Sequence, residues 1–273
     1  MKTFVMGVIA LASLSAVQRA TAPAGASQIP GFIGNPVQPP KMNVPAGFTP
    51  IFNGRDLTGW HVSKTNHHGI TPDYHVTHGI IIGTQRPLGS GGILLTDKKY
   101  KNVEVYMEVK PDWGCDSGLF LRSDEAGDAY QVTMDYLPTG AIGAMYGEGL
   151  DGVNGQNNRP GSTPSAAQRA TEAQLAAKPP SQRLDEMPDP KLPWVKAWKR
   201  EAWNRIRARI EGDVPHIQAW VNDQQVLDFT DTANHAAGGI TEGPIAIQIH
   251  GGPDRWIPGG FWRWRVIAVK ELP

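Results

Sequence analysis

The 273-residue chain has one cysteine, Cys115, so it has neither an intrachain disulfide nor a set of thiolates for a metal site. Basic and acidic residues balance at 26 each, which does not indicate a nucleic-acid partner or an anionic membrane surface. The sequence also contains no G-x-S-x-G nucleophile elbow and no phosphate-binding loop. Stability must therefore come from a hydrophobic core, in which we expect the thiol of Cys115 to be buried.

Long hydrophobic runs are equally scarce, and the one that occurs lies near the start of the sequence. Residues 4–17 form an apolar stretch of about 14 residues, shorter than the roughly 20 that a membrane-spanning helix requires. Lys2 precedes this stretch, and an A-x-A-like cleavage site ends at Ala26. The pattern predicts a signal peptide over residues 1–26 and export to the periplasm or the cell exterior, with a disordered or buried N-terminus as the alternative. Residues 27–47, rich in Pro and Gly, are interpreted as an extended lead-in, and no later segment predicts a membrane span.

Turn-forming residues are abundant by contrast, with 31 Gly and 23 Pro. Between the turns, apolar and polar residues alternate, most regularly over residues 103–110. Short alternating strands with few helix signals predict an all-β sandwich or jelly roll, formed by a single domain over residues 48–273. The predicted strands are residues 103–110, 118–122, 129–136, 203–210, 216–221, 225–229, 244–250 and 262–270.

One region interrupts the alternation. Residues 150–195 are rich in Gly, Asn, Ala, Gln and Pro, and only residues 165–178 have a helix-forming composition. We expect a long surface insertion that carries one short helix. Long loops in compact domains often form a lid or wall of a functional site, although disorder is the alternative.

Three of the predicted strands have an unusually polar face, because residues two apart in a strand share a face. Directional hydrogen-bonding groups and small residues on one face predict a surface that holds a ligand such as a sugar. The alternative is an ordinary sheet face that meets water. The residues of this face are Asp116, Phe120 and Arg122, then Gln131, Thr133 and Asp135, and finally Ala246, Gln248 and His250.

Two segments are expected at the rim of this face. The glycine-rich residues 139–149 can approach a ligand closely and direct Tyr146 and Glu148 toward it, or else they form a twisted edge strand. Residues 250–256 place Trp256 as a platform on which a sugar ring stacks.

Four histidines lie close together in the sequence, at positions 67, 68, 75 and 78. Their spacing matches no standard zinc motif, and we interpret His67, His68, His75 and His78 as parts of surface loops. No cofactor is therefore expected, although a calcium ion held by carboxylates and carbonyls is compatible with the sequence.

Several segments together resemble the 3-keto-disaccharide hydrolase family. The first reads F-N-G-R-D-L-T-G-W, and the second, D-S-G-L-F-L-R, is similar to the N-S-G strand of that family. Asp116 stands where the family often has Asn, and Gln131 stands where it commonly has Glu. The resemblance covers residues 48–273, and its segments are residues 52–60, 116–122, 201–204 with 221–223, and 245–251 with 264–270.

The resemblance implies a concanavalin-like jelly roll of two curved antiparallel sheets that acts on a small carbohydrate. Cleavage of a 3-keto-glycoside would start with removal of the proton on C2, which the C3 carbonyl acidifies, and would require a base, an acid and a donor to the enolate oxygen. We predict His250 and Asp135 as base and acid, with Asp116 able to share a proton with Asp135. Arg122 is predicted to stabilise the enolate. Substrate contacts are expected from Gln131, Tyr146, Glu148, Gln248 and Trp256.

Two other functions fit the same fold. A non-catalytic carbohydrate-binding module would depend on Trp256 and Tyr146 rather than on His250. A conventional glucanase is the other alternative, but the E-x-D-x-x-E strand of such enzymes is missing.

Overall fold

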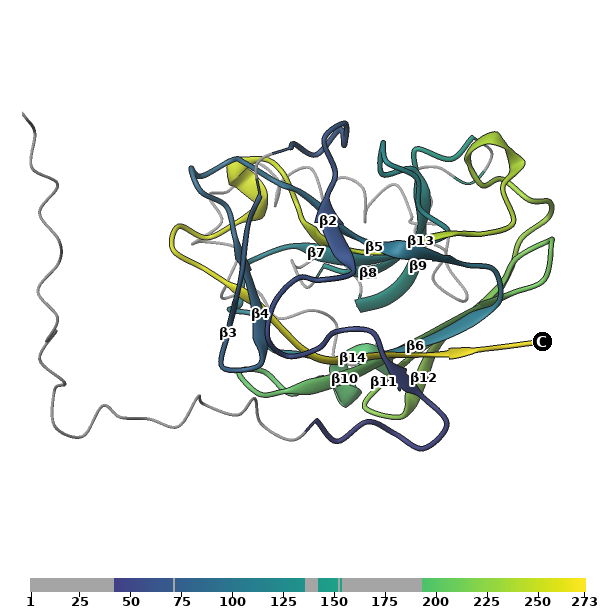
Figure 1. Cartoon of the computed structure of the whole chain (residues 1–273), viewed down its shortest axis with the longest axis horizontal. Coiled ribbons are helices and arrows are strands. Elements are labelled where there is room, and N and C mark those ends of the chain that lie inside the picture. Colours follow the sequence, from purple (N-terminus) through teal and green to yellow (C-terminus); the bar gives the residue numbers. More distant parts are fainter. Residues whose placement is uncertain (1–41, 71, 136–141, 152, 154–192) are drawn as a thin grey trace, which may run out of the picture. The chain divides into compact units, whose positions relative to one another are not determined.

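The computed structural model describes residues 42–70, 72–135, 142–151, 153 and 193–273. Two antiparallel sheets form two layers in Figure 1, which confirms the all-β jelly-roll sandwich. The predicted signal peptide, most of the lead-in, the helix predicted over 165–178 and most of the 150–195 insertion lie outside the described residues. Within these residues, no helix has the length and apolar character needed to cross a membrane.

The six-stranded sheet has the order β2-β5-β13-β7-β8-β9. The other sheet has the order β12-β11-β10-β6-β14-β4-β3, with β1 paired to β14. The strands of the first sheet are β2 (Trp60–Val62), β5 (Gly92–Tyr100), β7 (Ser117–Leu121), β8 (Ala129–Met134), β9 (Ile142–Glu148) and β13 (Gly243–Ile249). Those of the second are β1 (Thr49–Pro50), β3 (Asp73–Thr77), β4 (Ile80–Thr84), β6 (Val103–Val109), β10 (Asn204–Glu211), β11 (His216–Val221), β12 (Gln224–Thr230) and β14 (Trp262–Glu271).

Short helical turns join some of the strands. The described part of the chain has one α-helix, α3 (Pro193–Ala197), and two 3₁₀ turns, η1 (Ala237–Gly239) and η2 (Pro253–Arg255). The turn η2 follows β13 directly and precedes β14, so it shapes the loop at one end of the six-stranded sheet.

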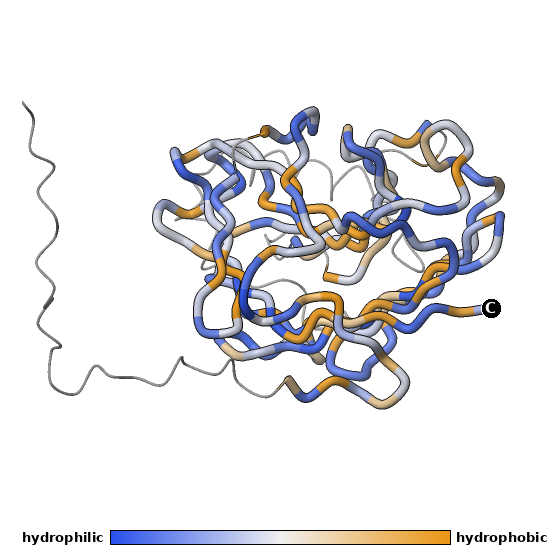
Figure 2. Tube along the Cα trace, viewed as in Figure 1, coloured by the Kyte–Doolittle hydropathy of each residue, from blue (hydrophilic) through white to orange (hydrophobic). Residues whose placement is uncertain are grey.

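The core lies between the two sheets, and alternation along the strands builds it. Val105 of β6 and Ile247 of β13 belong to one buried cluster that draws on both layers. Trp262 and Trp264 stack in it with ring centroids 5.5 Å apart. Hydrophobic residues concentrate in the strands of both layers in Figure 2. Cys115 is buried in the same cluster, as expected, and burial raises the pKa of its thiol well above the usual value.

All eight predicted strands are present, with ends that differ by one or two residues. The glycine-rich segment is β9, which lies at the edge of the six-stranded sheet, so the edge-strand alternative is the correct one. The strands β1 to β5 were not predicted. Five consecutive residues at the start of β5 are buried, so this strand lacks the alternation of apolar and polar residues. Its residues Ile93 and Leu95 face away from the core and pack with Phe120 in a second apolar cluster.

Candidate active site

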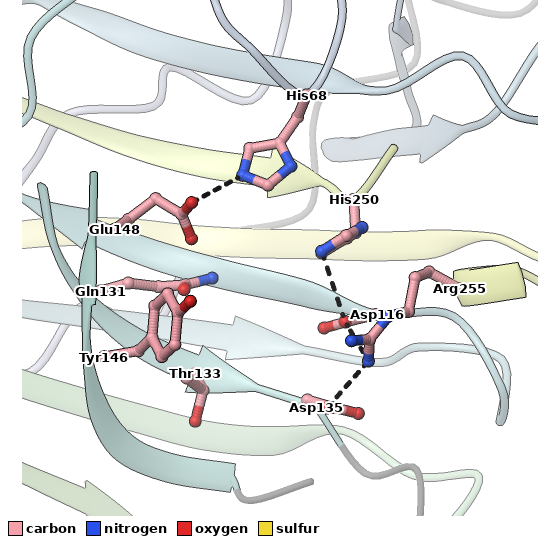
Figure 3. Close-up of a pocket in the computed structure, with 9 residues that line it drawn as sticks. All are labelled: His68, Asp116, Gln131, Thr133, Asp135, Tyr146, Glu148, His250 and Arg255. Carbon is pink, nitrogen blue, oxygen red and sulfur yellow. Dashed lines mark hydrogen bonds and ion pairs between the residues drawn. The ribbon is translucent and has the colours of Figure 1, made fainter. Parts of the chain in front are cut away.

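A pocket of about 240 Å³ opens on the face of the six-stranded sheet that is turned away from the core. Tyr130, Val132 and Met134 of β8 face the core, whereas Gln131 and Thr133 between them line the pocket. Figure 3 shows how side chains from several strands and loops converge on it. The residues that line the pocket are His68, Asp116, Gln131, Thr133, Asp135, Tyr146, Glu148, His250 and Arg255.

Strand ends bring Asp116 and His250 together. Asp116 comes directly before β7 and His250 comes directly after β13, its antiparallel neighbour. The backbone N–H of His250 donates to the carbonyl of Asp116 at 3.3 Å. The two side chains also lie close together, with Nε2 of His250 3.9 Å from Oδ2 of Asp116. Two residues 134 positions apart therefore form one pair because the sheet topology places them side by side.

The pKa values of both members of this pair are shifted by burial. Asp116 is 5% exposed, and burial raises its pKa to about 7 although the charge of Arg255 opposes the shift. Burial lowers the pKa of His250 below its usual value. Nδ1 of His250 lies 2.6 Å from the carbonyl oxygen of Gly251 and must donate to it, which leaves Nε2 as a lone pair. Near neutral pH the pocket thus holds an acid and a base next to each other.

Arg255 supplies a cation to the same end of the pocket. Its Nη1 lies 3.5 Å from Oδ2 of Asp116 and 3.5 Å from Oδ2 of Asp135. The loop that carries it is held by Gln85, whose amide nitrogen donates to the carbonyls of His250 at 2.5 Å and Gly252 at 2.9 Å. The guanidinium is therefore fixed beside two carboxyl groups, where it can stabilise a negative charge that develops on a ligand.

Amide and hydroxyl groups form the floor of the pocket. Nε2 of Gln131 donates to Oε1 of Gln248 at 3.1 Å, and Gln248 is fully buried. A Cβ at Gly118 would lie 2.1 Å from Nε2 of Gln131, so glycine in the D-S-G motif makes room for this side chain. Tyr146 is paired with Gln131 across β8 and β9 and lines the same floor. Gln131 and Tyr146 can bind ligand hydroxyls, whereas Gln248 fixes Gln131 from below.

His67, His68 and Glu148 form the opposite wall. Oε1 of Glu148 lies 2.8 Å from Nε2 of His67 and 3.3 Å from Nε2 of His68. Burial acts to raise the pKa of Glu148, but its contacts with the two histidines lower it below the usual value. The ring of His68 also contacts that of His250, with centroids 4.7 Å apart, so this wall adjoins the acid–base pair.

The structure brings together six of the nine site residues predicted from the sequence. These six residues line the pocket, and Gln248 lies directly beneath them as the support of Gln131. The remaining two predicted site residues, Arg122 and Trp256, do not line the pocket. The six are Asp116, Gln131, Asp135, Tyr146, Glu148 and His250.

Arg122 does not reach the pocket. Its φ of 50° is in the left-handed region and ends the alternation of β7, so it does not share the face of Asp116. The side chain is buried and donates to the carbonyls of Lys101 and Gly212, at 3.2 Å and 2.6 Å. Gly212 lies in the hairpin between β10 and β11, so Arg122 joins the two sheets and does not line the pocket.

Trp256 is not a stacking platform, because it is completely buried in the core between the sheets. Its indole N–H donates to the carbonyl of Gly260 at 3.0 Å. The turn η2 interrupts the alternation that the strand pattern assumes, so Trp256 lies in the core and its neighbour Arg255 lines the pocket.

Three pocket residues were not among the predicted site residues. Thr133 shares the predicted polar face of Gln131 and Asp135, so its parity already indicated it. Arg255 lies in the predicted rim loop, next to the tryptophan that was chosen instead. His68 lies in a loop as predicted, but its side chain lines the pocket and is not on the surface. His75 and His78 are exposed, although His75 belongs to strand β3 and not to a loop.

Comparison with known proteins bears on this geometry. Residues 47–270 match the 3-keto-alpha-glucoside-1,2-lyase-like domain. The chain belongs to this family. The match covers nearly all of the described sandwich and includes every residue that lines the pocket. No curated protein matches the chain.

Solved structures are similar to the chain at low identity. A candidate glycosyl hydrolase of Parabacteroides distasonis ATCC 8503 is 15% identical over 83% of this chain and 94% of its own, with a TM-score of 0.48. The carbohydrate-binding module CBM66 of Bacillus subtilis is 11% identical over 79% of this chain and 97% of its own, with a TM-score of 0.47. The alginate lyase Aly36B is 10% identical over 73% and 85%, with a TM-score of 0.40. Similarity of this degree carries no information on the ligand of the present chain.

Proposed function

We propose that this protein cleaves 3-keto-glycosides by eliminating the C1 substituent after removal of the proton on C2. The observation that carries the proposal is the pair of Asp116 and His250 in one pocket, with pKa values shifted toward each other. Membership of the 3-keto-alpha-glucoside-1,2-lyase-like family supports a substrate with a carbonyl at C3. Such a carbonyl acidifies the C2–H bond, so a neutral imidazole is basic enough to act on it.

Each step has a group in the pocket that suits it. His250 takes the C2 proton at Nε2, and the electron pair of the broken C–H bond forms an enolate at the C3 oxygen. Arg255 provides the positive charge that stabilises this oxygen, a role predicted for Arg122 from the sequence. The enolate then expels the C1 oxygen, which takes the proton of Asp116. Water added across the resulting C1–C2 double bond gives the free 3-keto-sugar.

Substitution of the usual family glutamate by Gln131 does not remove the carboxylates from the site. Asp116, Asp135 and Glu148 all line the pocket. Gln131 instead donates to Gln248 and can offer its own amide oxygen to a substrate hydroxyl. The replacement therefore changes the hydrogen bonding of the floor and leaves the acid–base pair intact.

A non-catalytic binding module has less support in this geometry. Binding modules hold sugars on exposed aromatic faces, and Trp256 is buried. Among the described residues, Tyr146 is the only tyrosine, tryptophan or phenylalanine that lines the pocket. The pocket is instead rich in titratable groups, which is typical of catalytic sites.

The test is incubation of the protein with 3-keto-trehalose or a 3-keto-glucoside, in parallel with the parent sugar that lacks the keto group. We expect release of 3-keto-glucose from the keto-sugar and no turnover of the parent. A folded protein that turns over no keto-sugar would contradict the proposal. Equal turnover of the parent sugar would favour a conventional glycosidase.

The proposal includes export, which is supported by the signal-peptide pattern over residues 1–26. Expression of the full chain in a Gram-negative host, followed by fractionation and N-terminal sequencing, tests it. We expect a periplasmic or extracellular product that starts near Ser27. A cytoplasmic product that retains Met1 would contradict export.

A further inference from the structure

The wall formed by His67, His68 and Glu148 holds three metal-ligating groups whose donor atoms lie within 4.8 Å of one another. The acid–base pair of the proposed reaction does not include them. His68 and Glu148 are largely buried, with side chains 10% and 13% exposed, whereas His67 is 45% exposed at the mouth of the pocket. Two imidazoles and a carboxylate in this arrangement need a physical explanation.

The hydrogen bonding of His67 places two acceptor atoms against each other, Nε2 of His67 and Oε1 of Glu148. Its Nδ1 lies 3.0 Å from the carbonyl oxygen of Ala126 and must donate to it. In the neutral ring Nε2 is then a lone pair, and it lies 2.8 Å from the carboxylate oxygen of Glu148. Two acceptors at this distance require either a proton between them, carried by His67 or by Glu148, or a metal ion. An Nδ1–H bonded to a backbone carbonyl is also the usual support of a histidine that ligates a metal through Nε2.

His68 favours the metal ion. Its Nε2 is buried and 3.3 Å from the same oxygen of Glu148, but it makes no hydrogen bond there. At this separation the pair does not have the geometry of a hydrogen bond. A proton on His67 leaves this buried nitrogen without a partner, whereas an ion beside the oxygen provides one.

The loop that carries both histidines is fixed in place. The amide of Asn66, a buried side chain, donates to the carbonyl of Ala126 at 3.1 Å and accepts from the backbone N–H of His68 at 2.9 Å. The backbone N–H of His67 donates to the same carbonyl of Ala126 at 3.3 Å. Preorganised ligands of this kind lower the entropic cost of binding an ion.

We propose that His67, His68 and Glu148 bind one divalent transition-metal ion, with Zn²⁺ as the best match. Nitrogen ligands favour Zn²⁺ over Ca²⁺ and Mg²⁺, and two histidines with one glutamate form a known type of open zinc site. Tetrahedral bonds of 2.0–2.1 Å place ligand atoms about 3.3 Å apart. The distance between His68 and Glu148 already has this value, and that between His67 and Glu148 has to lengthen by a few tenths of an ångström.

The open coordination position of such an ion would face the pocket. The ring of His68 contacts that of His250, so a ligand oxygen on the ion would lie near the acid–base pair. In this position the ion can bind an oxygen atom of the sugar and orient it against His250. This role rests on the proposed function, but binding of the ion does not.

Metal binding is tested on the purified protein after chelator treatment and dialysis. Titration with Zn²⁺ in a calorimeter and metal analysis after desalting give the affinity and the stoichiometry, and Co²⁺ absorption reports tetrahedral nitrogen ligands. The variants are His68→Ala and Glu148→Gln, and the matched control is His75→Ala, an exposed histidine of the same sequence cluster that lies 3.7 Å from Asp73. Melting temperatures without metal verify that each variant is folded.

We expect one Zn²⁺ per chain for the wild type and the control, with a higher melting temperature in its presence. Each ligand variant is expected to lose affinity by more than the roughly tenfold to hundredfold that loss of a supporting residue costs. No Zn²⁺ binding by the folded wild type, or binding that survives in both ligand variants, would overturn the site. Metal binding without turnover of any keto-sugar would overturn the proposed function and leave the site standing.

Discussion

The two sheets each present a polar face away from the core, and these faces differ in how their charges are matched. On the eight-stranded sheet, opposite charges pair across neighbouring strands. Arg265 donates to Glu108 at 2.6 Å, and Arg207 donates to Glu104 at 3.1 Å. The same arginines cover tryptophan rings, with Arg207 4.0 Å from the ring centre of Trp220. Every one of these charges has a partner on its own surface.

On the six-stranded sheet, the charges are buried in a pocket and their partners are shared. Arg255 lies between Asp116 and Asp135, and Glu148 lies between two histidines. Burial raises the pKa of Asp116 and lowers that of His250, so both groups can exchange protons near neutral pH. A polar sheet face by itself therefore does not identify a site. Buried polar groups with incompletely matched charge identify it.

The largest difference between the two faces is expected in turnover. His250→Ala removes the proposed base and should lower the rate on a 3-keto-glucoside by roughly a hundredfold to ten-thousandfold. Arg265→Gln removes a charge from the outer face of the other sheet and should leave the rate unchanged. Steady-state kinetics on both variants measure this. Equal losses in the two would contradict the assignment of the pocket.

Two tryptophans provide the next comparison. Trp256→Ala leaves a cavity in the core and should lower the free energy of unfolding by roughly 3–5 kcal/mol. Trp220→Ala loses a contact with Arg207 at the surface, worth about 0.5–1 kcal/mol. Urea denaturation measures both. A Trp256→Ala variant with wild-type stability and lost sugar binding would restore its role as a stacking platform.

The pH dependence of stability tests the burial of the Asp116 carboxyl. The pKa of Asp116 is about 7 in the folded state and near 3.8 without the fold, so the folded state retains a proton between these values. Its contribution to stability is therefore lost as the pH rises from about 4 to about 7. Asp116→Asn should remove this loss and raise the relative stability at pH 8 by at most about 4 kcal/mol. Denaturation between pH 4 and pH 8 checks it, and parallel curves for both proteins would contradict it.

The smallest effect is expected on the outer face. Glu108→Gln breaks the pair with Arg265 and should lower the free energy of unfolding by less than about 1 kcal/mol. The difference should shrink further in 1 M salt, where exposed charges are screened. Denaturation at low and high salt tests this. A loss of several kcal/mol would show that this face is held by its ion pairs.

The sequence predicts the strands and their faces well where alternation is strict. In β8 and β13 and just beyond their ends, parity separates the core residues from Gln131, Asp135 and His250, because residues that face the core alternate with residues on the other side of the sheet. Parity fails where the backbone leaves the extended conformation. Arg122 has a positive φ and Trp256 follows a 3₁₀ turn, so both point away from the predicted face.

Loop residues of the site were not predictable from local sequence. His68 reaches the pocket because Asn66 and the carbonyl of Ala126 hold its loop against a segment about 60 positions away. No local pattern encodes such a contact. Asp116 and His250 are assembled in the same way, by pairing of β7 with β13, but their parity made each of them recognisable on its own strand.

The central claim is that the pocket removes the proton on C2 of a 3-keto-glycoside. Turnover of such a substrate in D₂O, followed by NMR or mass spectrometry of the 3-keto-sugar, tests it most directly, with the product incubated with His250→Ala as the control for spontaneous exchange. We predict that each turnover introduces one solvent deuterium at C2. A product that retains its original hydrogen at C2 would show that the glycosidic bond is cleaved without C2 proton removal and would contradict this mechanism.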